Sequence, residues 1–170
     1  MYNENGIQRG KDFEEIIKKC FLAVPETAVE RLPDPTAGYM GYRNPCDFLI
    51  YHYPYVYFIE CKTVHSHRMP FTNLTFNQRV GMLEASKNKG VIAGIICWFI
   101  PVDKTYFIPI QVYEKYRLAG AKSLNLNKMD PEKDGWVEIH GQKKRVFFDY
   151  DIDRFIDYCT RKHLGEREYK

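Results

Sequence analysis

Two acids and a lysine in the first half of the chain have a spacing that suits phosphodiester chemistry: Asp47, Glu60 and Lys62. Two carboxylates held close together repel each other unless they share a proton or a cation. A hard divalent cation such as Mg²⁺ takes all-oxygen ligands and keeps several waters for chemistry. A neighbouring lysine orients or deprotonates an attacking water, or neutralises a phosphate oxygen. The three residues therefore predict metal-assisted hydrolysis of a phosphodiester.

A hairpin brings the two acids together. Strands are expected over residues 47–52 and 55–62, with the turn at Tyr53-Pro54, which places Asp47 opposite Glu60. Residues two apart on a strand share a face, so the lysine points the same way as Glu60, and Cys61 points into the core. From the residues alone, the alternative is a cross-strand salt-bridge cluster on an exposed sheet face.

The elements that carry this hairpin follow from hydrophobic periodicity. Apolar residues at helical spacing predict helices over residues 12–22, 75–88, 112–118 and 151–162, and further strands are expected over 28–32, 91–100 and 104–110. The 75–88 helix is expected to pack through Phe76, Val80, Met82 and Leu83, and the last helix through Ile152, Phe155, Ile156 and Cys159. The fold class is therefore α/β, with a central mixed sheet of about five strands and helices on both sides.

The connections are expected to be irregular in two places. Residues 33–45 are rich in proline and glycine and predict a loop, and residues 63–73 form a basic loop. Near the end of the chain, residues 136–140 are expected to pair with residues 145–149 across Gly141.

Composition predicts one globular domain, residues 1–170, of 45% hydrophobic and 28% charged residues. Five unpaired cysteines and an N-terminus without a signal-peptide pattern predict a cytoplasmic protein with no membrane partner. The net charge of +3 is uneven, because residues 62–128 carry ten basic and three acidic side chains. Such a basic block suits a phosphate-bearing partner, although it is equally what a solvated surface carries.

Several blocks, taken in order, resemble the PD-(D/E)xK nucleases, and among them the RecU-type Holliday junction resolvases. Besides Asp47…Glu60-Cys61-Lys62, the resemblance rests on four further blocks that extend it from about residue 9 to 160: Arg9-Gly10-x-x-Phe13-Glu14-Glu15-x-Ile17, Pro70-x-x-Asn73-x-x-x-x-Gln78, Tyr106-Phe107-x-Pro109 and Gly120-Ala121-Lys122-Ser123-Leu124. The resemblance implies a restriction-endonuclease-like core.

The resemblance also implies roles. Asp47 and Glu60 ligate Mg²⁺, for which Mn²⁺ substitutes, with the main-chain carbonyl of Cys61, and Lys62 is the catalytic lysine. Gln78 and Glu14 complete the site from two helices. Residues 21–46 are shorter than the family's stalk, and Pro45 replaces a hydroxyl residue often found there, so nuclease chemistry is better supported than junction selectivity.

DNA contacts are expected from basic residues near this site and from the site's edge: Arg68, Arg79, Lys87, Lys89, Lys122 and Thr63. Tyr39 and Tyr42, in the proline-rich loop, are the aromatics most suited to stacking on bases. His65 and His67 are expected to be loop residues near DNA.

The sequence thus predicts a Mg²⁺-dependent endonuclease that cuts four-way DNA junctions as a homodimer, since symmetric cutting needs two matched sites. Two alternatives stay open: a general nuclease of a phage or restriction system, and a DNA-binding scaffold that does not cut.

Overall fold

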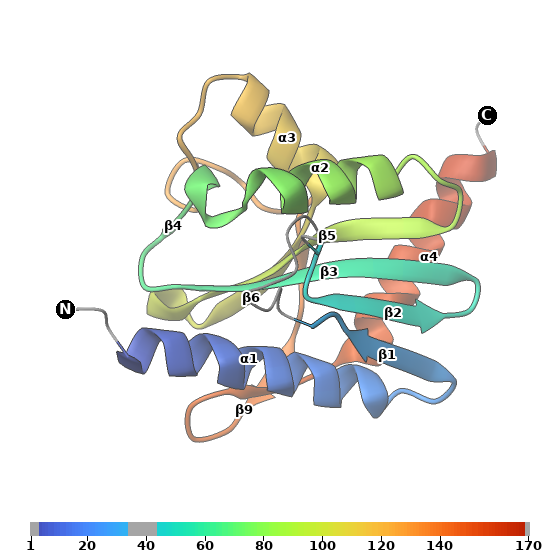
Figure 1. The fold of residues 1–170 in the computed structure, drawn as a ribbon, viewed down its shortest axis with the longest axis horizontal. Helices are drawn as coiled ribbons and strands as arrows, with labels where there is room; N and C mark the ends of the chain where they lie inside the picture. The colour runs from blue at the N-terminus through green and yellow to red at the C-terminus, as the bar shows by residue number, and fades with distance from the viewer. Residues whose placement is uncertain (1–3, 34–43, 169–170) are drawn as a thin grey trace.

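The computed structural model describes residues 4–33 and 44–168, which form a sheet with helices packed around it (Figure 1). The helices are α1 (Glu4–Leu22), α2 (Phe76–Ala85), α3 (Ile110–Leu118) and α4 (Ile152–Glu168). The central strands are β1 (Thr27–Arg31), β2 (Phe48–His52), β3 (Tyr55–Val64), β5 (Val91–Phe99), β6 (Lys104–Pro109) and β8 (Val137–Glu138). Four shorter strands are β4 (Arg68–Pro70), β7 (Ser123–Asn125), β9 (Gly141–Lys143) and β10 (Phe148–Tyr150).

The central sheet has six strands in the order β1-β2-β3-β5-β6-β8. Only β3 and β5 pair in parallel, and the other neighbours are antiparallel. The predicted α/β class with a mixed sheet is confirmed, with β8 as the extra strand. The parallel step falls at β3, the strand that carries Glu60 and Lys62.

Each face of the sheet has its own core. One core joins Phe13 and Ile17 of α1 to Phe155 and Ile156 of α4, and the other contains Met82 of α2 and Tyr113 of α3. Between them, β5 is buried along almost its whole length, as expected of an apolar strand covered on both faces. The four inward positions predicted for α4 are all buried.

Three sequence predictions were wrong in detail. Residues 136–140 do not pair with residues 145–149: β8 joins the central sheet beside β6, and β10 pairs with β9. The basic loop predicted over 63–73 contains the end of β3, then β4, then a 3₁₀ turn (Phe71–Asn73). Phe76 does not pack, since it is 69% exposed, although Met82 on the same helix is fully buried.

Two sequence predictions concern membrane-spanning helices and the proline-rich loop. No helix in the described part of the chain is long and apolar enough to cross a membrane. Much of the loop predicted over residues 33–45 lies outside the described residues, as do Tyr39 and Tyr42.

Candidate active site

The β2–β3 hairpin has the predicted register. Phe48 pairs with Ile59 and His52 with Tyr55, so the strands turn at Tyr53-Pro54. The regular ladder ends at Phe48, and the main-chain N–H of Asp47 donates to the Ile59 carbonyl at 3.1 Å.

The Asp47 carboxylate lies over the backbone of β3. Its Oδ2 accepts the main-chain N–H of Cys61 at 2.8 Å. Asp47 and Glu60, called the carboxylate pair below, are therefore neighbours, as predicted, with the Asp47 carboxylate hydrogen-bonded one residue beyond Glu60. The Cys61 side chain is buried in the core beneath α1, as expected from strand alternation.

Glu60 is fully buried and only half satisfied. Its Oε1 accepts from Lys62 Nζ at 2.5 Å and from Gln78 Nε2 at 2.7 Å. Its Oε2 is buried and accepts no hydrogen bond from any described residue. A buried carboxylate oxygen without a partner costs free energy, so this atom calls for a ligand.

The electrostatics of the cluster follow from burial. Burial raises the pKa of Glu60 to about 7, against the opposing attraction of Lys62, and repulsion from Asp47 and Glu14 adds to it. Burial also raises the pKa of Asp47, which the Cys61 N–H counteracts. Burial alone would lower the pKa of Lys62, but the Glu60 carboxylate outweighs it and raises this pKa. The cluster thus holds three carboxylates, Asp47, Glu60 and Glu14, against two cations, the Lys62 ammonium and the Arg31 guanidinium.

Gln78 reaches Glu60 because the start of α2 is fixed. The Thr75 hydroxyl accepts the Gln78 main-chain N–H at 3.3 Å, and the Gln78 Oε1 accepts the Thr75 N–H at 2.9 Å. This reciprocal capping box orients the side-chain amide so that its NH₂ faces Glu60. The predicted role of Gln78 at the site therefore has a geometric basis.

Close packing seats α2 against the segment that carries the carboxylate pair. A Cβ added at Gly81 would meet the Pro45 Cβ at 2.6 Å, closer than real contacts allow. Gly81 therefore lets α2 approach Pro45, two residues before Asp47. Sequence reasoning missed this contact, because nothing local links residue 81 to residue 45.

Glu14 lies at the edge of the cluster. Its Oε2 pairs with Arg31 Nη2 at 3.0 Å, so the carboxylate is held by β1, and its charge raises the pKa values of both members of the carboxylate pair. The structure therefore brings together the predicted Asp47, Glu60, Lys62 and Gln78, with Glu14 adjacent.

The donor set suits a hard divalent cation. It offers two carboxylates, one with a free buried oxygen, in a region of excess negative charge. In the described parts of the chain, no three His, Cys, Asp or Glu side chains cluster closely enough to form a metal site. A bound cation would therefore need main-chain oxygen or water as well, and the Cys61 carbonyl stays a prediction as a ligand.

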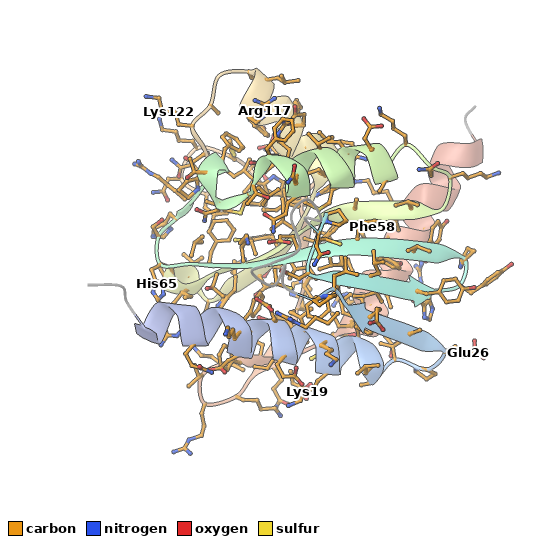
Figure 2. The ribbon with its side chains drawn as sticks, in the orientation of Figure 1. Lys19, Glu26, Phe58, His65, Arg117 and Lys122 are labelled. Atoms are coloured by element: carbon orange, nitrogen blue, oxygen red, sulfur yellow. The ribbon has the colours of Figure 1, made fainter. Side chains whose placement is uncertain are left out.

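The predicted DNA contacts fall into two groups. Arg68 is exposed in β4, and Lys122 precedes its partner β7, where the Lys122 carbonyl accepts the Phe71 N–H at 3.3 Å. In Figure 2, His65 lies where β3 ends and Lys122 lies above it, beside the end of α3, both at the left of the view. Lys87 and Lys89 instead precede β5, near Val56. Val56 is six residues before Lys62 on β3, so these two lysines lie roughly 20 Å from Lys62 along the strand.

Two other predicted DNA contacts are unfavourably placed: Arg79 is bound by another side chain, and Thr63 lies on the other face of β3. Arg79 pairs with Glu114 of α3 at 3.0 Å, and Glu114 also holds Arg117 at 2.7 Å. Strand alternation places Thr63 on the face opposite Lys62. Glu114 is a residue that sequence reasoning missed: its i,i+3 spacing to Arg117 was visible, but its contact with Arg79 was not.

Comparisons with known proteins bear on the family to which the chain belongs. A family model described as RecU: Recombination protein U matches residues 17–150. Among solved structures, the chain is similar to a 1.6 Å structure of Archaeoglobus fulgidus Hjc, a Holliday junction resolvase from an archaeal hyperthermophile. That match has 19% sequence identity and a TM-score of 0.43, and it covers 74% of this chain and 100% of the other. No curated protein matches closely enough to count as a relative. Since the family model spans well over half of the sequence, the chain belongs to the Recombination protein U family.

Proposed function

We propose that this single-domain protein is a metal-dependent endonuclease that resolves four-way DNA junctions. Membership of the Recombination protein U family supports a role in recombination. The observation that carries the chemistry is the buried Glu60, whose Oε2 has no partner and whose Oε1 is held by Lys62 and Gln78. A purely structural salt bridge would satisfy both oxygens.

Asp47 and Glu60 hold Mg²⁺ in this proposal, and Mn²⁺ substitutes for it. The Cys61 carbonyl and water complete the ligands. The cation supplies positive charge that polarises the scissile phosphate. Its binding is favoured because its charge offsets the burial of the carboxylate pair and the repulsion from neighbouring carboxylates, which together raise the pKa values of Asp47 and Glu60.

The chain's own residues position the reaction. Lys62 is held at 2.5 Å from Glu60, on the same face of β3, where its ammonium neutralises a phosphate oxygen or orients an attacking water. Gln78 fixes the Glu60 carboxylate, so that its free oxygen keeps one direction. Glu14, paired with Arg31, adds negative charge at the edge of the site.

DNA approaches over the side of the molecule where β3 ends, in this proposal, because Arg68 and Lys122 are exposed there. Lys87 and Lys89, roughly 20 Å away along β3, would contact DNA away from the scissile phosphate, whereas Arg79 is held by Glu114 and Thr63 lies on the opposite face of β3. Symmetric cutting of a four-way junction needs two matched sites, which a two-fold homodimer supplies.

The test is cleavage of a synthetic four-way junction and of linear duplex with the same sequence, in Mg²⁺ or in EDTA. We expect paired symmetric nicks in the junction alone, lost in EDTA. Asp47→Asn should abolish cutting but keep binding, whereas the exposed Asp149→Asn is the matched control and should cut normally.

The other outcomes select between the remaining functions. Equal cutting of both substrates would replace the resolvase with a general nuclease that uses the same site. Tight junction binding without cutting by the unaltered protein would favour a scaffold. If Asp47→Asn still cuts, the assignment of the site is wrong.

A further inference from the structure

Phe76 is a large apolar side chain that the fold leaves in solvent. It is the first residue of α2, and 69% of its surface is exposed. Its helical spacing to Val80 predicted a packing role, which the structure contradicts. An exposed aromatic ring on the helix that contacts Glu60 through Gln78 is a candidate for contact with bases, because every base offers a face for stacking.

The ring is partly covered by a cation that is itself held in place. The Arg79 guanidinium lies 5.3 Å from the ring centroid of Phe76. Arg79 pairs with Glu114 at 3.0 Å, and its side chain is only 18% exposed. The guanidinium is therefore held on one side of the ring, while the rest of the ring stays open to solvent.

Phe76 is also held at a fixed place relative to the carboxylate pair. The capping box between Thr75 and Gln78 encloses it, and Gln78 Nε2 contacts Glu60 Oε1 at 2.7 Å. Phe76 precedes Gln78 by two residues, so its backbone lies about 3 Å nearer the start of α2. Its side chain leaves the helix about 200° round from that of Gln78, on the side where Arg79 lies over the ring. The first turn of α2 contains no acidic residue that would repel a phosphate backbone. The ring is therefore fixed at the start of the same helix that contacts Glu60 through Gln78, on the side of α2 that faces away from Glu60.

We propose that Phe76 stacks on a base exposed at the branch point and so favours branched DNA over linear duplex. This inference rests on the proposed function. In continuous duplex both faces of each base are covered by neighbouring pairs, whereas a branch point interrupts the stack. A ring held at the start of α2, on DNA whose scissile phosphate lies at Asp47 and Glu60, gains a stacking partner only where the stack is interrupted. Phe76 is thus a specificity-determining residue, separate from the groups that act on the phosphate.

The experiment compares the affinity for junction and for linear duplex in the Asp47→Asn background, in which DNA stays intact. Phe76→Ala should weaken junction binding about ten-fold, in keeping with the loss of one stacked base, and leave duplex binding unchanged. Phe76→Trp should retain the preference. Phe76→Leu, which keeps an apolar side chain but no ring face, should behave like Phe76→Ala. Tyr53→Ala, which removes another exposed ring (75%) at the β2–β3 turn, is the matched control and should bind like the parent.

A fluorescent base analogue, 2-aminopurine, placed near the branch point reports stacking directly. Its emission should change on binding the parent protein and Phe76→Trp, and not on binding Phe76→Ala. Unchanged junction preference in Phe76→Ala, or equal loss of junction and duplex binding, would overturn the inference. A lower oligomeric mass of Phe76→Ala in sedimentation would also overturn it, by assigning the ring to a protein contact. If the unaltered protein cuts no DNA, the proposed function fails, and the affinity comparison still decides the role of Phe76.

Discussion

The burial of Glu60 makes the folding stability of the metal-free protein depend on pH. This burial raises the pKa of Glu60 to about 7 from an ordinary 4.5. The folded state therefore binds this proton more tightly than the unfolded chain does. Stability is lost as the pH rises from about 4.5 through 7, and the full penalty is present at pH 8. Glu60→Gln removes the ionisation, so the metal-free variant should be more stable than the unaltered protein at pH 8.

The magnitude follows from the shift. Two to three pKa units at about 1.4 kcal/mol each give a penalty of about 3 kcal/mol. The variant loses part of this gain because the Lys62 ammonium no longer has the Glu60 carboxylate as its partner. That loss is limited, because the Lys62 side chain is 25% exposed to water and Asp47 remains close to it. We therefore expect a net gain of about 1–2 kcal/mol, which raises the melting temperature by about 3–6 °C for a domain of this size.

Thermal unfolding followed by circular dichroism, in EDTA at pH 8 and at pH 5, measures this gain. The advantage of Glu60→Gln should shrink towards zero at pH 5, where Glu60 is protonated in the folded state. Adding Mg²⁺ at pH 8 should reverse the order, since a cation that binds only the folded protein stabilises it, and the variant has lost a ligand.

The matched control is Glu138→Gln, which changes a half-exposed glutamate paired with Lys104 at 3.0 Å. It should show neither the gain at pH 8 nor the loss of Mg²⁺ response. A Glu60→Gln protein that is less stable than the unaltered one at both pH values would refute the reasoning. That result would mean that the Lys62–Glu60 pair is net stabilising and that the site is not poised for a cation.

Three further outcomes test how the site is held. Gly81→Ala should slow single-turnover cleavage about 10- to 100-fold, because its Cβ would meet Pro45 and push α2, with Gln78, away from Glu60. Thr75→Ala should cost about 1 kcal/mol in urea unfolding through loss of the helix cap, and Thr75→Ser should restore it; no change in the midpoint would contradict the capping role. Arg68→Ala should reduce the slope of log affinity against log salt by about one unit, whereas Lys19→Ala on the outer surface of α1 should leave it unchanged (Figure 2).

Local patterns account for the parts of the fold that the sequence predicted. The hairpin register depends on one turn and on two short stretches next to it, so Tyr53-Pro54 and the strand alternation were enough to predict it. The buried face of α4 follows from one helical period, and β5 from one apolar run. In each case the residues that form the sequence pattern are the same residues that form the structural element, or lie next to it.

Contacts between distant segments account for what the sequence could not predict. Strands β4 and β7 are three residues each and more than fifty residues apart, and β8 contributes two residues to the sheet. Such short strands show no periodicity of their own, and their pairing depends on where the longer elements place them. The Arg79–Glu114 ion pair and the approach of Gly81 to Pro45 are of the same kind.

The hydrophobic alternation of the hairpin decides where the acids point. Phe48, Ile50, Tyr57 and Ile59 are fully buried in the core beneath α1 and α4. Because side chains alternate along a strand, this core forces Glu60 and Lys62 to the other face, towards Gln78 of α2. A slip of β3 by one residue would turn the whole apolar set out of the core and both charges into it, at a cost far above that of any single contact. The position of the candidate site is therefore enforced by residues that take no part in its chemistry.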